Sequence, residues 1–440
     1  PVGAATKGQI QVVIDLGNNI HIEQKENMGP NAGAGVFGIG ILVLPNPNGL
    51  KTIETSSFSQ GCGLGGIGAL LVKGQIEGKG VRFTQGTGVY GLGIFQGQGS
   101  HKSTYWAERN GQGLGMTKGV GLFSHQGDDS SIKGGLVQPD PREPMGSVSL
   151  CQGVGFGRRA YVGGGVGIAV VKGDRNTVKG SYFSQGCGYW HSVGVFRYRG
   201  HHSLLQARRY DLGSGVHSAF GHFQMFGDHN RILNWGVGPA YGWDNSLGSS
   251  LVDGSDNEFQ ASWGTGMASI NSWSFSYWQG NRNKLLLPSF GEGRYYRRRL
   301  SYSVQILDGD DNLIQLGKKP LEPKKPIRIM ATPWGTFSAS DLKFDPDLKL
   351  EPPVWEKQPQ EKALNRERVD LQKKIKQSQE KIPLNKIGDL VDVTGAFSLD
   401  KKSPREALGL LLDLENKDIA SLVNNVEPAA MEQEIKHRII

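Results

Sequence analysis

The sequence predicts a mainly β fold, a parallel β-solenoid of roughly ten to eleven coils followed by a small α-helical region. Three observations lead to this fold class. Glycine makes up 65 of the 440 residues, a glycine-containing turn recurs every 25–29 residues, and the composition changes sharply near residue 315. Short apolar segments between turns of fixed period are what the coils of a solenoid require.

The first repeated element is a turn of glycine, two polar residues and then Asn or Ser. Its clear copies begin at Gly127, Gly173, Gly200, Gly227, Gly254, Gly280 and Gly309, and the last six of these are 27, 27, 27, 26 and 29 residues apart. The third residue after each glycine predicts a ladder of side chains that bond to the turn backbone: Ser130, Asn176, Ser203, Asn230, Asn257, Asn283 and Asn312. The fifth residue is always apolar and is predicted to point inward: Ile132, Val178, Leu205, Ile232, Phe259, Leu285 and Ile314.

A second repeated element, Gln-Gly-x-Gly, lies in the other half of the unit. Copies that keep the glutamine begin at Gln60, Gln85, Gln152 and Gln185. Later copies replace it with Leu212, Trp235, Trp263 and Phe290. Because Cys62 and Cys187 occupy equivalent places in this element, we expect small buried residues there rather than catalytic or zinc-bound thiols. Glycine recurs because every coil turns at the same places, where φ is positive or backbones come close.

The alternation of Gly-Asp-Asp-Asn turns with Phe-Ser-Gln-Gly-Cys-Gly segments resembles bacterial glycine-rich parallel β-helix repeat proteins over roughly residues 10–315. The resemblance implies a fold and little about activity. Such rods serve as scaffolds, adhesins, carbohydrate-processing enzymes and capping structures, so the fold does not choose among them.

The composition divides the chain into a solenoid over 1–315, a Pro/Lys-rich connector over 316–356 and a helical region over 357–440. Residues 316–440 contain 42 charged residues in 125, and the connector carries the prolines and lysines expected of an extended, semi-rigid segment. Apolar residues at helical spacing follow from Leu364 onward. The end of this region loosely resembles paired-helix repeats of the HEAT type, and a helical cap or docking arm is the simplest interpretation.

Two histidines are candidate metal ligands, because His202 and His229 hold the same turn position one coil apart and imidazole is a common zinc ligand. Residues such as Asp129 and Arg175 hold that position in other copies, as a variable polar turn would allow. The Gly-x-Gly-x-x-Gly segment that begins at Gly86 does not indicate a dinucleotide, because related Gly-x-Gly segments recur in every coil. The sequence predicts no cofactor.

Aromatic and basic residues near the end of the solenoid could form a surface for a ligand or partner. The tryptophans concerned are Trp235, Trp243, Trp263, Trp273 and Trp278. If these tryptophans are exposed, they would form an apolar platform for sugar rings or a partner. If they are buried, they fill the core of the last coils. The arginines are Arg294, Arg297, Arg298 and Arg299. This run could bind phosphates. Nucleic acid is not favoured as a partner, because the net charge is only +8 and a solvated strand edge protected by charged residues explains the run equally well.

No catalytic constellation stands out, so the sequence predicts a non-enzymatic structural or interaction protein. We expect other protein subunits as its partners, in a bacterial envelope assembly at the cell envelope or surface. The alternative is a carbohydrate-binding or carbohydrate-cleaving protein that uses the Trp- and Asp-rich last coils on a polysaccharide. No stretch approaches the roughly 20 apolar residues of a membrane-spanning helix, and the chain begins at Pro1, as a processed or partial chain would.

Overall fold

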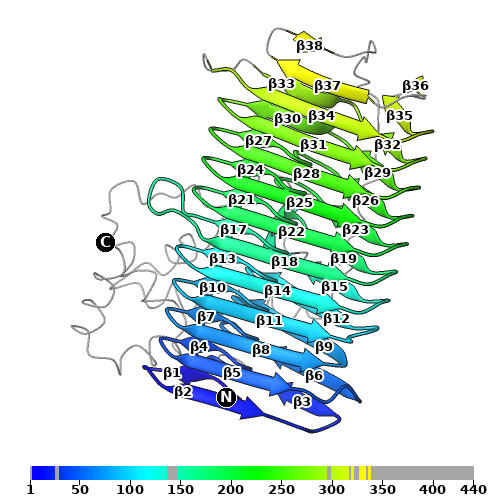
Figure 1. Ribbon diagram of the computed structural model, residues 1–440. Coiled ribbons are helices and arrows are strands. Elements are labelled where there is room, and N and C mark those ends of the chain that lie inside the picture. Colours follow the sequence, from blue (N-terminus) through cyan, green and yellow to red (C-terminus); the bar gives the residue numbers. More distant parts are fainter. Residues whose placement is uncertain are drawn as a thin grey trace. The chain divides into compact units, whose positions relative to one another are not determined.

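A computed structural model confirms the parallel β-solenoid, which winds through eleven coils (Figure 1). It describes residues 2–24, 29–135, 146–294 and 299–316, together with the backbone of strands at 319–321, 327–332 and 335–337. Each coil contributes one strand to each of three parallel sheets, and the described residues contain no helix. The predicted helical region, 357–440, lies outside the described residues.

Two of the three sheets define the flat sides of the solenoid. The long-strand sheet contains β2 (Ile10–Ile14), β5 (Ile39–Leu44), β8 (Ile67–Lys73), β11 (Leu92–Gln98), β14 (Val120–Gln126), β18 (Val166–Lys172), β22 (Val193–Arg199), β25 (Phe220–Phe226), β28 (Leu247–Asp253), β31 (Trp273–Gln279) and β34 (Tyr302–Asp308). The third sheet contains β3 (Ile20–Glu23), β6 (Leu50–Thr55), β9 (Gln75–Arg82), β12 (Thr104–Arg109), β15 (Ser131–Gly134), β19 (Thr177–Lys179), β23 (Leu204–Ala207), β26 (Arg231–Asn234), β29 (Glu258–Ala261), β32 (Lys284–Leu286) and β35 (Leu313–Leu316).

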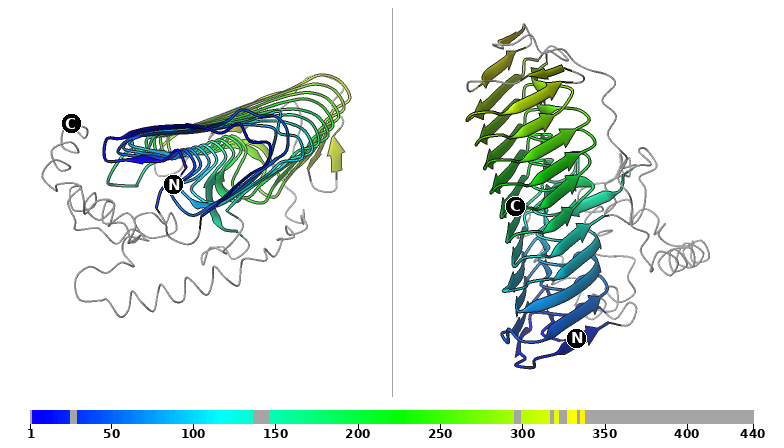
Figure 2. Two further views of the ribbon diagram at one scale, coloured as in Figure 1. Left: turned by 90° about the horizontal axis from the view of Figure 1, so that it is seen from below. Right: turned by 90° about the vertical axis from the view of Figure 1, so that its right-hand side faces the viewer.

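A short-strand sheet joins these two sides at a corner of each coil. It contains β1 (Ala5–Thr6), β4 (Gly35–Val36), β7 (Gly63–Leu64), β10 (Gly88–Val89), β13 (Gly115–Met116), β17 (Gly155–Phe156), β21 (Gly188–Tyr189), β24 (Gly215–Val216), β27 (Gly242–Trp243), β30 (Thr265–Ser269) and β33 (Phe290–Gly293). An added pair, β16 (Val148–Cys151) and β20 (Tyr182–Ser184), forms a small parallel sheet of its own. Figure 2 shows the coils following one another along a single axis.

The long strands are paired residue for residue, so equivalent positions form straight rows along the solenoid. Ile10 is paired with Ile39, and Ile39 is paired with Ile67. The wide step in the repeat lies between Val120 and Val166, which are paired although 46 residues separate them. The insertion between them contains residues 136–145, which lie outside the described residues, and a longer corner loop at 157–165.

The predicted inward positions form the core. All seven apolar residues at the fifth turn position are buried. They pack against rows of inward side chains from the long strands, in which Phe95 stacks on Phe123 with ring centroids 5.4 Å apart. All three cysteines of the chain are buried, as the repeat predicts for Cys62 and Cys187.

The glutamines of the second element point inward and link neighbouring coils. The Nε2 of Gln60 donates to the backbone oxygen of Lys79 (2.6 Å), and the Nε2 of Gln185 donates to that of Gln206 (3.0 Å). Gln112 opens a further copy of the element, Gln-Gly-Leu-Gly, which is not among the four named from the sequence, and makes the same contact with Lys133 (2.9 Å).

Close backbone contact explains the glycine that opens each turn. A Cβ atom on Gly227 would lie 2.1 Å from the carbonyl oxygen of Gly200 in the preceding coil, and the φ of Gly227 is 124°. Any side chain at this position would therefore force the coils apart. Two residues later the backbone is left-handed without glycine, as at Arg175 (φ 54°) and His229 (φ 57°).

Antiparallel strands close the solenoid after its last coil. β37 (Ile327–Thr332) pairs with β34, and β38 (Gly335–Phe337) pairs with β37. β36 (Lys319–Leu321) pairs in the same way with β35. These strands lie within the predicted connector, 316–356, and cover the last strands of the long-strand and third sheets, whose edges would otherwise be exposed.

Candidate interaction surface

The outer face of the long-strand sheet is the most distinctive surface of the solenoid, and Figure 1 looks onto it. The first three outward positions of each long strand form rows along the axis, which we call the first, middle and last row. The strands from β8 onward add a fourth outward position at their ends, which is mostly polar, as at Lys73 and Lys172. The first row consists of Ile10, Ile39, Ile67, Leu92, Val120, Val166, Val193, Phe220, Leu247, Trp273 and Tyr302. Every member is aliphatic or aromatic.

The other two rows are also largely apolar. The middle row consists of Val12, Ile41, Ala69, Ile94, Leu122, Ile168, Val195, His222, Ser249, Phe275 and Val304. The last row consists of Ile14, Val43, Leu71, Gln96, Ser124, Val170, Arg197, Gln224, Leu251, Tyr277 and Ile306. Most of the large hydrophobic side chains that are strongly exposed on the described residues belong to these rows, including Ile10, Val120 and Phe275.

The outer face of the third sheet, on the same coils, has the opposite character. Its outward positions are mostly charged or hydroxylated, as in the paired residues Thr52 and Glu77. Ion pairs cross it from coil to coil. The Nζ of Lys79 lies 2.5 Å from an oxygen of Glu54, and Arg231 lies 3.1 Å from Glu258. One fold therefore carries one solvated face and one apolar face.

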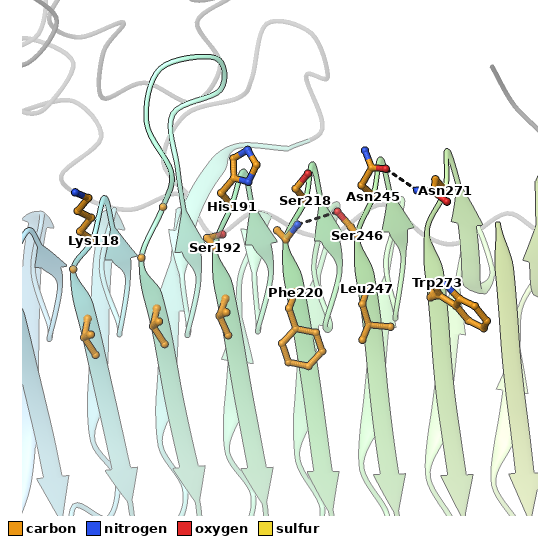
Figure 3. Close-up of a pocket in the computed structure, with 17 residues that line it drawn as sticks. Lys118, His191, Ser192, Ser218, Phe220, Asn245, Ser246, Leu247, Asn271 and Trp273 are labelled. Atoms are coloured by element: carbon orange, nitrogen blue, oxygen red, sulfur yellow. Dashed lines mark hydrogen bonds between the residues drawn. The ribbon is translucent and has the colours of Figure 1, made fainter. Parts of the chain in front are cut away.

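A groove of about 650 Å³ runs along the edge where the long strands begin (Figure 3). One wall is the first row from Val120 to Trp273. The other wall is a polar ladder of corner residues: Lys118, His191, Ser218, Asn245 and Asn271. Small residues such as Ala219 and Ser246 lie between the walls, where the Ala219 amide donates to Ser246 Oγ (3.1 Å). The groove thus adds a polar margin to the apolar face.

Titratable groups inside the solenoid are held in place by its packing. His125 is buried, with Nδ1 3.0 Å from the Tyr105 hydroxyl and Nε2 3.1 Å from the Gly127 oxygen, and burial lowers its pKa to about 4. Burial likewise raises the pKa of Asp211, whose two carboxyl oxygens accept from Asn234 Nδ2 at 2.8 and 3.0 Å. Burial also raises the pKa of Cys62. These groups lie in the core and not on either outer face.

The two candidate metal ligands lie one above the other at an exposed corner. The rings of His202 and His229 stack with centroids 4.8 Å apart and 4° between their planes. The same corner continues as ion pairs, in which Arg175 Nε lies 2.7 Å from Asp129. Across the described part of the chain, no group of three or more His, Cys, Asp or Glu side chains could hold a metal ion.

The five tryptophans of the last coils lie in different environments. Trp273 is 49% exposed and belongs to the first row, whereas Trp263 is 51% exposed and follows β29 at another corner. Trp278 is 1% exposed and packs in the core against Phe259. Trp235 and Trp243 are half-buried. Trp273 is thus the one member of the five that lies on the apolar face.

The arginine run is only partly described. Arg294 is half-buried and donates from Nη2 to Glu292 Oε2 (3.0 Å), and this hydrogen bond raises its pKa. Arg299 is exposed, whereas Arg297 and Arg298 lie outside the described residues.

A sequence signal for the apolar face does exist. A strand with one solvated face alternates apolar and polar residues, but β5 reads Ile-Gly-Ile-Leu-Val-Leu, as a strand covered on both sides would. The inward residues Leu42 and Leu44 explain one half of this pattern. The outward residues Ile41 and Val43 are the other half, and nothing in the described structure covers them.

No protein-family model, curated protein or solved structure matches the chain. The strand pairing alone therefore establishes the solenoid. Among the described residues, no helix is long and apolar enough to cross a membrane.

Proposed function

We propose that this protein is a non-enzymatic interaction protein, a rigid rod that holds another protein against the outer face of its long-strand sheet. The observation that carries the proposal is the contrast between the two outer faces of the same coils. A sheet face packed against a partner needs apolar rows, whereas a solvated one carries charge.

The size of the apolar face supports a protein partner. Eleven strands at about 4.8 Å and three outward rows give a face of roughly 50 by 20 Å, or about 1,000 Å². Soluble proteins rarely leave apolar patches above a few hundred Å² uncovered, and a standard interface takes about 800 Å² from each partner. That the assembly belongs to a bacterial envelope stays a prediction from the sequence.

A matched pair of lysine substitutions tests the proposal. Ile168→Lys places a charge in the middle row of β18, and Thr177→Lys places the same charge on the outer face of the third sheet in the same coil. Burying an unpaired ammonium against an apolar partner is costly. We expect Ile168→Lys to reduce the assembled fraction at least tenfold, measured as native mass after gentle extraction from the source cells.

The control variant, Thr177→Lys, shows which result would contradict the proposed docking face. Thr177→Lys should assemble as the parent does, and both variants should keep the β-sheet circular dichroism of the parent. Equal assembly of the two variants, or equal loss, would contradict a docking role for the long-strand face.

The groove favours a second candidate, an interaction protein for an elongated polysaccharide. The exposed ring of Trp273 on one wall and the amide side chains of Asn245 and Asn271 on the other are groups that bind sugars. Under this candidate Ile168→Lys leaves the native mass unchanged, and added polysaccharide alters the fluorescence of the parent but not of Trp273→Ala.

A further inference from the structure

The polar residues of the last row are arranged symmetrically along the solenoid. β18 belongs to the sixth of the eleven coils, so five coils lie on each side of it. Ser124 and Arg197 lie one coil to either side of β18, and Gln96 and Gln224 lie two coils to either side. The remaining seven positions of the row are aliphatic or aromatic. The row therefore has the same polarity pattern when read from either end.

The same centre relates other features of the face. The two smallest side chains of the middle row, Ala69 and Ser249, lie three coils to either side of β18. The next outward residues at the ends of those two strands are Lys73 and Asp253, both exposed and opposite in charge.

Side-chain size is also complementary about this centre. The tenth coil presents the aromatic residues Trp273, Phe275 and Tyr277, whereas the second coil presents only aliphatic residues, among them Ile39 and Ile41. Reversing the order of coils in a facing sheet would place these large side chains on the small ones. The distance between two such sheets, about 10 Å, could then stay even along the rod.

We infer that a second copy of this chain covers the outer face of the long-strand sheet, related by a two-fold axis that runs parallel to the strands over β18. The inference rests on the proposed function, whose partner it identifies. This axis reverses the order of coils and keeps each row opposite itself, so the contact is isologous. Each coil then faces the coil equally distant on the other side of β18.

Several facing pairs match polar groups across such a contact. Arg197 meets the hydroxyl of Ser124, which can accept from its guanidinium, and Lys172 meets its own copy at the rim, on the axis. The amide of Gln96 meets the amide of Gln224, and each amide can both donate and accept. Lys73 meets Asp253 at the rim. On the axis the apolar residues Val166, Ile168 and Val170 face their own copies. The face of about 1,000 Å² on each chain is sufficient for a stable dimer.

A two-fold axis along the solenoid fits the same face poorly. It would place each coil on the same coil of the partner and the last row on the first. Arg197 would then be buried against Val193, and Gln224 against Phe220, without polar partners. The aromatic tenth coil would also face itself, which would hold the sheets further apart at one end.

The mass of the purified chain and a crosslink between engineered cysteines test the inference. The three native cysteines are buried, so an added surface thiol reacts alone. One chain carries Lys73→Cys, a second carries Asp253→Cys, and the two are mixed with a short bismaleimide. We expect a mass of twice the chain and at least fivefold more crosslinked dimer in the mixture than with either variant alone. Two copies of residue 73 would be separated by six coils, or about 29 Å.

The matched control is Glu77→Cys, which lies in the same coil as Lys73 but on the outer face of the third sheet. Mixed with Asp253→Cys it should give no excess of crosslinked dimer. Ile168→Lys should convert the purified dimer to a monomer, whereas Thr177→Lys should not.

The outcomes separate this inference from the proposed function. A purified chain that stays monomeric at every concentration tested, or a dimer in which Lys73→Cys crosslinks to itself as readily as to Asp253→Cys, overturns the inference. If Ile168→Lys still dismantles the native assembly in that case, the docking face stands and its partner is a different protein. If Ile168→Lys changes neither the purified chain nor the native assembly, both proposals fail.

Discussion

Single polar side chains hold one coil to the next. The Oδ1 of Asn230 accepts the Ser203 amide of the preceding coil (2.9 Å), and its Nδ2 donates to the Gly200 oxygen (3.0 Å). The Asn230 amide in turn donates to the Oδ1 of Asn257 (2.8 Å). The predicted ladder is therefore confirmed, and each step satisfies backbone groups that the closed turn hides from water.

Replacing one asparagine of the ladder should lower the local stability of its coil. Asn230→Ala leaves the Ser203 amide and the Gly200 oxygen unpaired in the interior, at a cost of about 3 kcal/mol. This corresponds to roughly 100-fold faster hydrogen exchange at the Ser203 amide, measured in the full chain. His229→Asn is the control, because His229 is exposed and asparagine tolerates its left-handed backbone. Unchanged exchange at Ser203 in Asn230→Ala would show that the ladder contributes little.

The inner and outer faces of the long-strand sheet differ in the residue types that their positions require. The first inward position is glycine in most long strands, where another backbone passes, and the next is a large side chain in several of them, such as Phe95 or Phe223. Outward positions repeat apolar residues with no such steric demand. At the end of the solenoid, β37 pairs with the last long strand, β34, and so covers its free edge.

Removing this cap should expose a reactive edge. The double substitution Ile329→Pro with Met330→Pro removes the adjacent amides of β37, whichever of them faces β34. We expect the uncovered edge of β34 to pair with other chains and to raise the average mass in light scattering several-fold. Ile329→Thr with Met330→Thr keeps the amides and should retain the parent mass. An unchanged mass in the proline variant would show that the cap does not protect the edge.

The sequence repeat predicts the whole solenoid because the residues at the corners of each coil recur at a fixed spacing along the chain. The regular steps from Gly173 to Gly309, the Asn ladder and the inward apolar position are all local signals, and the structure confirms them. The apolar face could not be identified in the same way. It depends on the register that brings Ile10, Val166 and Tyr302 into one row, which only the pairing of long strands supplies.

The tryptophan cluster shows the same limit. Trp273 and Trp278 are five residues apart in one strand, so opposite faces of the sheet receive them, and only Trp273 reaches the outer face. Counting tryptophans in the sequence could not separate the surface from the core. The side of the sheet to which each side chain points does separate them.

Trp273 and Trp263 provide the most direct test of the docking face, because they are almost equally exposed, at 49% and 51%, and lie on different sides of the rod. Both should be oxidised at similar rates in Ile168→Lys, when the native assembly and this variant are treated with hydroxyl radicals and digested for mass spectrometry. In the native assembly we expect Trp273 to be protected at least fivefold and Trp263 to remain as reactive as before. Equal oxidation of the two tryptophans in the native assembly would contradict a covered long-strand face.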